Sequence, residues 1–152
     1  MNSQLPIALH IMGFLASRNG DALTSEVLAG TYGTSPVVLR RVLVKLKKAG
    51  LVQTKRGAGG GSVLAREATA ITLREVYEAV TEDSSLMPGF SKGCSGKVAP
   101  ILADYVNGLF AEAEEALLAK LGETTVAGMD AHVRGRIQSA LGCGPESSDP
   151  EE

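Results

Sequence analysis

Residues 35–62 read SPVVLRRVLVKLKKAGLVQTKRGAGGGS, and this stretch determines how the whole chain is interpreted. No Asp or Glu occurs between Glu26 and Glu67, so the region is basic throughout. Its cationic residues are Arg40, Arg41, Lys45, Lys47, Lys48, Lys55 and Arg56. The formal net charge of −2 for the whole chain conceals this local excess, which favours an anionic partner.

The pattern of this stretch predicts a helix followed by a β-hairpin. Ser35 and Pro36 favour a helix start, and Gly50 favours its end. Residues 51–54 and 62–65 are typical of short strands, joined by a basic, glycine-rich turn at 55–61. One buried stripe is predicted for the helix by the helical spacing of Leu39, Val42, Leu43 and Leu46.

A basic helix beside a basic hairpin suits duplex DNA. The helix fits the major groove, while an arginine on the hairpin can reach the adjacent minor groove. Glycines at the tip allow the backbone to approach phosphates closely. An ordinary solvated helix face and a flexible glycine linker are the alternatives, but the acid-free run and the flanking strand patterns favour the DNA interpretation.

Composition places this stretch in a globular, DNA-binding context. The chain has 152 residues and 44% hydrophobic residues, enough for one compact domain or a small domain with a helical arm. Residues 1–80 hold ten Lys and Arg against five Asp and Glu, whereas residues 81–152 hold five against twelve. Few aromatic residues are available to stack on single-stranded bases.

No apolar run is long enough for a membrane span, and two cysteines do not make a disulfide framework. We therefore expect a cytoplasmic protein without membrane contact.

The residues before this stretch predict two more helices. Residues 5–18 have apolar side chains at helical spacing, and Asn19 and Gly20 follow as a stop. A second, short helix is expected over residues 23–29, with Thr24 as its cap. Helix, glycine-containing turn and basic helix form a helix-turn-helix, and the hairpin makes it winged. Thr24 and Ser25 could donate to a phosphate, although simple capping explains them equally well.

The rest of the chain predicts helices and a loop. A helix capped by Thr72 is expected over 71–80, a long one over 98–121 and a last one over 126–141. The long helix needs a partner along its length, either its own domain or, as we expect, a second copy of the chain. The predicted fold is mainly α with a small β-hairpin wing: a winged helix-turn-helix at 1–81, a sensor-type loop at 82–97, a dimerisation helix and C-terminal helix at 98–141, and a disordered acidic tail at 142–152.

The segment TSPVVLRRVLVKLKKAGLVQTKRGAGGGSVLAREATAITLREVYEAV resembles the Rrf-type family of bacterial winged helix-turn-helix regulators, which includes IscR, NsrR and CymR. The wing departs from the family pattern at Ala58, where Pro is usual, and at Ser62, where an aromatic is usual. The resemblance implies a homodimeric repressor or activator on a palindromic operator, with Arg56 in the minor groove. It places in the major groove Ser35, Val37, Arg40 and Arg41.

The same resemblance raises the question of an iron-sulfur cluster. Family members with a cluster usually present three cysteines near residues 82–98, whereas this sequence has Cys94 there and Cys143 far downstream. A two-iron cluster takes four ligands, so a conventional cluster is disfavoured, although Cys94 with His10 could contribute to an atypical one. A zinc site lacks the paired ligands it needs.

The Cys94 thiol is the preferred sensing candidate. Lys92 and Lys97 flank it, and positive charge favours the reactive thiolate. Cys94 could pair with Cys94 or Cys143 of a second chain, while an inert surface cysteine remains the alternative.

These patterns predict a sequence-specific transcription regulator, expected to act as a homodimeric repressor, with a winged module for protein partners as the alternative. An enzyme is not expected, since no catalytic set or phosphate loop occurs. The predicted DNA-binding residues are Thr24, Ser25, Ser35, Val37, Arg40, Arg41, Lys45, Lys55, Arg56 and Gly57.

Overall fold

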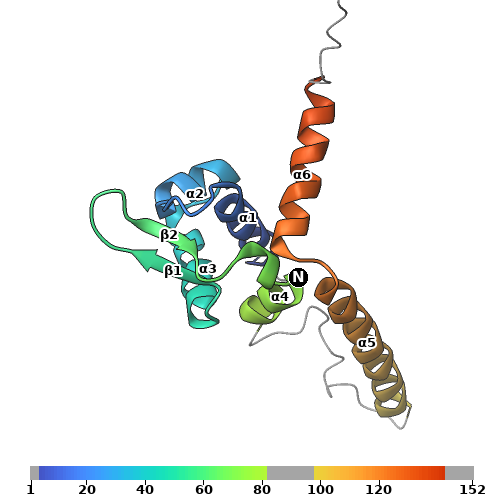
Figure 1. The fold of residues 1–152 in the computed structure, drawn as a ribbon. Coiled ribbons are helices and arrows are strands. Elements are labelled where there is room, and N and C mark those ends of the chain that lie inside the picture. Colours follow the sequence, from blue (N-terminus) through green and yellow to red (C-terminus); the bar gives the residue numbers. More distant parts are fainter. Residues whose placement is uncertain (1–3, 82–97, 143–152) are drawn as a thin grey trace, which may run out of the picture.

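The structure is a computed structural model that describes residues 4–81 and 98–142 (Figure 1). The predicted loop at 82–97 and the tail from residue 143 lie outside the described residues. The elements in chain order are α1 (Gln4–Ser17), α2 (Ser25–Tyr32), α3 (Pro36–Lys48), β1 (Val52–Lys55), β2 (Gly61–Leu64), the 3-10 helix η1 (Ala68–Ala70), α4 (Leu73–Thr81), α5 (Ala99–Gly122) and α6 (Val126–Ala140). This arrangement confirms the predicted fold class, mainly α with one β-hairpin wing.

Helix α1 lies at the centre of the hydrophobic core. Its Ile11 and Met12 are fully buried, and α3, α4 and α6 all pack against it. The apolar stripe predicted for α3 is buried along its whole length. Asn19 and Gly20 follow α1 with φ angles of 48° and 93°, and this left-handed turn ends the helix as predicted.

Capping fixes the bounds of the helix-turn-helix. The Thr24 hydroxyl accepts from the Val27 amide at 3.3 Å, and the Ser35 hydroxyl accepts from the Val38 amide at 3.4 Å. These bonds satisfy amides that have no partner inside their helices. Helix α2 runs to Tyr32, three residues beyond the predicted end, because the chain turns only at Gly33, whose φ is 77°.

The hairpin is anchored to the segment before α2. Strands β1 and β2 are antiparallel, with Lys55 opposite Gly61. The Leu23 amide donates to the Ser62 carbonyl at 3.0 Å, and the Ser62 amide donates to the Leu23 carbonyl at 2.7 Å. A Cβ on Gly61 would lie 2.5 Å from that Leu23 carbonyl oxygen, so this close approach needs glycine.

Helix α4 begins with reciprocal capping bonds. The Thr72 amide donates to a Glu75 carboxylate oxygen at 2.8 Å, and the Glu75 amide donates to the Thr72 hydroxyl at 3.3 Å. This capping box confirms Thr72 as the predicted cap. Thr72 also forms a β-bridge with Thr125, and the following Val126 is fully buried. The start of α6 is therefore part of the core rather than of a separate arm.

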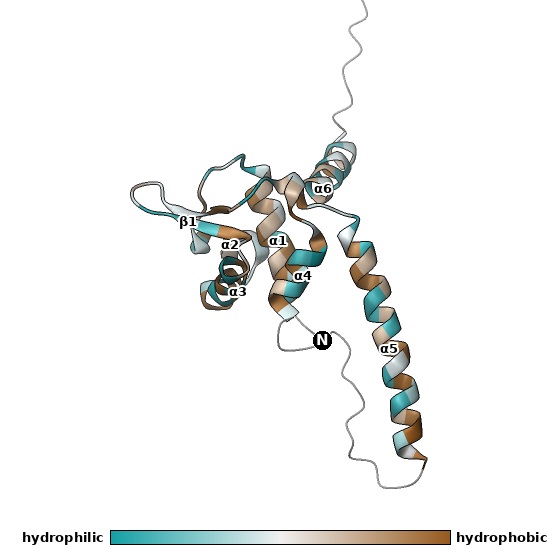
Figure 2. Ribbon diagram, turned by 60° about the horizontal axis from the view of Figure 1, so that its bottom comes forward, coloured by the Kyte–Doolittle hydropathy of each residue, from teal (hydrophilic) through white to brown (hydrophobic). Residues whose placement is uncertain are grey.

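Helix α5 projects from the core with large apolar side chains exposed. Figure 2 shows hydrophobic patches along its length. Its Ile101, Leu102 and Tyr105 are 71%, 54% and 67% exposed, and Leu109 is 46% exposed. The contacts of α5 with the core are made with α4, where the Tyr77 hydroxyl donates to Glu114 at 2.8 Å. Much of this helix lies uncovered in a single chain.

Candidate nucleic-acid interface

The outer face of α3 combines charge with exposed valines. Val37 and Val44 are 58% and 64% exposed, and they lie with Arg41 and Lys48 opposite the buried stripe. This face gives a helix that can donate hydrogen bonds from arginine and offer methyl groups to thymine. Ser35 lies at the N-terminal end of the same helix, where its side chain caps α3.

Arg40 takes part in a hydrogen-bonded ring with two residues at the start of α2. Its Nε donates to the Ser25 hydroxyl at 3.1 Å, and its Nη2 forms an ion pair with Glu26. The Ser25 hydroxyl donates in turn to the Glu26 carboxylate at 3.2 Å. The backbone amide of Glu26 and the guanidinium of Arg40 hold the pKa of Glu26 below its ordinary value. Glu26 was not among the predicted site residues.

A groove of about 440 Å³ separates α2, α3 and the hairpin. Arg40 and Lys47 line it from α3, and Thr54 lines it from β1. Thr24, Ser25 and Glu26 line it from the start of α2. The structure thus brings three predicted residues to one groove and adds Lys47, whose basic side chain in the acid-free run was the signal available in the sequence.

Two predicted DNA contacts have partners inside the domain. The Lys45 amine donates to the Val80 carbonyl at 3.4 Å, which places Lys45 on the flank of α3 that faces α4. The Lys55 amine donates to the Gly20 carbonyl at 2.9 Å, so it ties β1 to the turn after α1. Neither amine belongs to the ring around Arg40.

The hairpin tip leaves Arg56 exposed at the end of the wing. Gly57 follows with a φ of 97°, and its carbonyl accepts from the Gly60 amide at 3.0 Å. A Cβ on Gly60 would lie 2.6 Å from the Lys55 carbonyl oxygen. The glycines therefore build a tight turn, and the flexible-linker interpretation is wrong for the described tip.

His10 is a packed histidine in this structure. Nε2 of His10 is hydrogen-bonded to the Thr31 hydroxyl at 2.9 Å, and that hydroxyl lies 2.9 Å from the Leu28 carbonyl. The imidazole also stacks on Phe14, with the ring centroids 5.8 Å apart, and burial lowers the pKa of His10.

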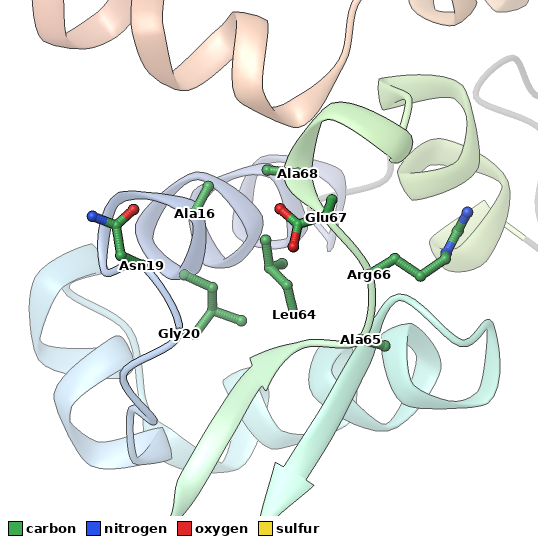
Figure 3. Close-up of a pocket in the computed structure, with 9 residues that line it drawn as sticks. Ala16, Asn19, Gly20, Leu64, Ala65, Arg66, Glu67 and Ala68 are labelled. Carbon is green, nitrogen blue, oxygen red and sulfur yellow. The ribbon is translucent and has the colours of Figure 1, made fainter.

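A second hollow, of about 420 Å³, lies where the wing joins the core (Figure 3). Ala16, Asn19 and Gly20 line one side, and residues 64–68 line the other. The Arg66 guanidinium is held by the Ala70 carbonyl at 3.2 Å and by Glu75 at 2.7 Å. Its polar side chains are those of Asn19, Arg66 and Glu67.

A model of the Rrf2 family, described as an iron-dependent transcriptional regulator, matches residues 1–131. The HTH-type transcriptional regulator IscR of Cereibacter sphaeroides is 39% identical over 94 residues, which cover 59% of this chain and 61% of the relative. The HTH-type transcriptional regulator NsrR of Bacillus licheniformis is 32% identical over 85 residues, which cover 55% and 59%. The chain thus spans about three fifths of the length of these relatives.

The family description mentions iron, which raises the question of whether the residues of this chain could bind it. Within residues 4–81 and 98–142, no group of three or more His, Cys, Asp or Glu side chains could hold a metal ion. Cys94 and Cys143, predicted as the thiols of interest, lie outside these ranges. Of the ligands considered for an atypical cluster, His10 is described, and its Nε2 lies 2.9 Å from the Thr31 hydroxyl. Within the described ranges, no helix is long and apolar enough to cross a membrane.

Solved structures show the same fold. CymR, the global cysteine regulator of B. subtilis, aligns with a TM-score of 0.62 at 24% identity, over 87% of this chain and 96% of that one. IscR from T. potens aligns with a TM-score of 0.62 at 21% identity, over 100% and 93%. The family match covers the described winged helix-turn-helix, α5 and the start of α6. The chain therefore belongs to the Rrf2 family of transcriptional regulators, which are not enzymes.

Proposed function

We propose that this chain is a cytoplasmic, sequence-specific DNA-binding regulator that acts as a homodimeric repressor. The observation that carries the proposal is the exposed outer face of α3, which lies beside a groove shared with the wing. An α-helix fits the major groove, where arginine reads guanine and apolar side chains contact thymine methyl groups. The family membership supports the same role.

Each part of the site has a distinct task on DNA. Arg41, Val37 and Val44 on α3 contact base edges in the major groove. Arg40 and Ser35, at the start of the same helix, face the same groove. Arg56 enters the neighbouring minor groove, where narrow A·T tracts attract arginine. Backbone phosphates are contacted by the start of α2, through the Thr24 hydroxyl and the Ser25 backbone amide, and by the wing, through Lys55 and Gly57. Lys45 and Lys55 each donate one N–H to a carbonyl, of Val80 and Gly20, and each ammonium has two further donors for a phosphate.

The exposed apolar side of α5 supports a homodimer. A second copy of this helix would cover Leu102, Tyr105 and Leu109 and so remove them from water. Two copies related by a two-fold axis would place two α3 helices on successive major grooves, which matches a palindromic operator. A dimer bound at a promoter would exclude the polymerase, and transcription in vitro with and without the operator tests repression.

Selection from a randomised duplex library, followed by titration of the selected duplex at several salt concentrations, tests DNA binding. Arg41→Ala and Arg56→Ala should each weaken binding about tenfold or more. A variant that loses a phosphate contact should also show a smaller slope of log affinity against log salt concentration. Arg74→Ala is the matched control, because Arg74 is an exposed arginine paired with Glu78 on α4. Unchanged affinity in both test variants would disprove the assigned contacts.

The signal is proposed to act at Cys94. Lysines at 92 and 97 favour its thiolate, and two such thiols can join in a disulfide when a peroxide accepts their two electrons and two protons. Anaerobic purification followed by a visible spectrum and an iron assay separates this proposal from an atypical cluster. A colourless protein whose Cys94 oxidises reversibly supports a thiol switch, whereas visible absorption with bound iron supports a cluster.

A further inference from the structure

Glu26 stands out among the residues that the DNA-binding proposal does not use. It is a carboxylate at the edge of the groove between α2, α3 and the hairpin, where a DNA phosphate would be repelled. The side chain is 59% exposed, so burial in the core does not account for its position. Its contacts are instead directed at Arg40 and Ser25.

The ring around Arg40 engages one edge of the guanidinium and leaves another available. Arginine has five N–H donors in one plane. Nε donates to Ser25 and Nη2 donates to Glu26, which together occupy the Nε–Nη2 edge. The end of the guanidinium still carries parallel N–H groups on Nη1 and Nη2. That pair of donors matches the O6 and N7 acceptors that guanine presents in the major groove.

Holding the side chain in place has an energetic consequence. A free arginine loses much rotamer freedom when it is fixed against a base. An arginine already held at one edge by two partners loses less, so the same contact binds more tightly and tolerates fewer alternative orientations. The fold supplies this restraint because Arg40 on α3 and Glu26 on α2 are brought together across the helix-turn-helix.

We propose that Glu26, with Ser25, is a positioning residue that makes Arg40 read a guanine in each half of the operator. This inference rests on the proposed function, since it concerns which base the regulator selects. Glu26 acts through Arg40 and lowers general affinity for DNA through its negative charge. It therefore lowers the affinity for unrelated DNA and raises the preference for guanine over the other bases.

The test is selection from a randomised duplex library, followed by titration of the best duplex and of duplexes changed at each position. The wild-type protein should select a guanine whose replacement weakens binding about 5- to 150-fold. Arg40→Ala should remove that preference at that position alone. Glu26→Ala should reduce the preference at least about fivefold while raising affinity for unrelated duplexes, and Glu26→Gln should fall between.

A double-variant comparison isolates the coupling. In an Arg40→Ala background, Glu26→Ala should change the affinities for the guanine duplex and for its substituted forms by the same factor. Glu78→Ala is the charge-matched control, because Glu78 is an exposed carboxylate paired with Arg74 on α4. This control should leave the guanine preference intact.

The possible failures are distinguishable. If the wild-type protein selects a duplex but both Glu26 variants retain the full guanine preference, the positioning role is wrong and the proposed function stands. If Arg40→Ala weakens all duplexes equally, Arg40 contacts phosphate and the inference is also wrong. If the wild-type protein selects no duplex, the proposed function itself fails.

Discussion

At the scale of single residues, glycine and capping side chains set the geometry of the winged helix-turn-helix. Gly61 lies where two backbone segments meet. The next residue, Ser62, forms two backbone hydrogen bonds with Leu23. Thr72 and Glu75 close the start of α4 in a comparable way. Each of these contacts involves only a few atoms, so each can be tested by one substitution.

Gly61→Ala should destabilise the domain by about 1–3 kcal/mol, since the added Cβ would lie 2.5 Å from the Leu23 carbonyl oxygen. Urea unfolding measures the change. Gly30→Ala is the control, because a Cβ there has open space and α2 gains a better helix former. That control should raise stability by about 0.5–1 kcal/mol. A Gly61→Ala protein as stable as the wild type would contradict the close approach.

Glu75 gives stability a pH dependence. The Thr72 backbone amide and the Arg66 guanidinium lower the pKa of Glu75 below its ordinary value of 4.5. A lowered folded-state pKa contributes stability above the unfolded value, and this contribution is lost as pH falls through the folded value. Glu75→Gln should therefore cost about 1 kcal/mol at neutral pH. The cost should begin to shrink as the pH falls below 4.5 and should vanish once the pH is below the lowered folded-state pKa.

Urea titrations at several pH values measure this convergence. Glu78→Gln is the control, because it alters an exposed helical pair worth only a few tenths of a kcal/mol. A Glu75→Gln deficit that persists unchanged in acid would show that the capping box is not the cause.

At the scale of elements, α5 is the helix that we propose as the dimer interface. Leu102, Tyr105 and Leu109 recur at helical spacing, and all are largely exposed in one chain. A charged side chain placed in this stripe would have to be buried in the proposed dimer, and burial of an unpaired charge is strongly unfavourable.

Tyr105→Glu combined with Leu102→Glu should raise the dimer Kd at least about a hundredfold. Burial of one such apolar side chain contributes about 1.5–3 kcal/mol, and a two-fold axis buries each side chain once in each subunit. Light scattering coupled to size exclusion measures the mass over a dilution series. Glu112→Gln is the control on an exposed position of the same helix. A double variant that stays dimeric would assign dimerisation to another surface.

The bounds of α3 could be predicted from sequence because Ser35, Pro36 and Gly50 act on neighbouring amides and carbonyls. The Arg40 ring could not, because its partner Glu26 comes from another helix and only the fold brings the two together. The helical spacing of apolar residues in α3 predicted that Lys45 lies outside the buried stripe. It did not reveal that Lys45 faces α4, where its amine donates to the Val80 carbonyl.

At the scale of the whole molecule, the uneven charge distribution and the proposed two-fold dimer both bear on how the protein would meet DNA. The basic first half of the sequence should be attracted to the proposed DNA and the acidic second half repelled, so we expect the chain to approach DNA in a preferred orientation. The start of α6 packs on α1, so the winged core and the base of α5 belong to one body. Half-site spacing on DNA should therefore be fixed by the dimer.

Inserting about five base pairs at the centre of the selected operator should abolish cooperative binding of the two half-sites, since half a helical turn moves them to opposite faces of the duplex. Anisotropy titrations should then give an affinity close to that of an isolated half-site. The same insertion outside the operator is the control and should have no effect. Full affinity for the interrupted operator would exclude a rigid two-fold dimer on these sites.

The pair of hydrogen bonds between Leu23 and Ser62 separates the part of the wing that is fixed to the core from the part that is not. It attaches the root of the wing to the backbone just before α2 without using any side chain of the tip. Residues 56–60 are thereby uncoupled from the placement of α3. A substitution at Arg56 or Ala58 can therefore change the minor-groove contact that we propose for the wing without moving α3, whereas Gly57 and Gly60 are restricted to glycine by a φ of 97° and by the Lys55 carbonyl.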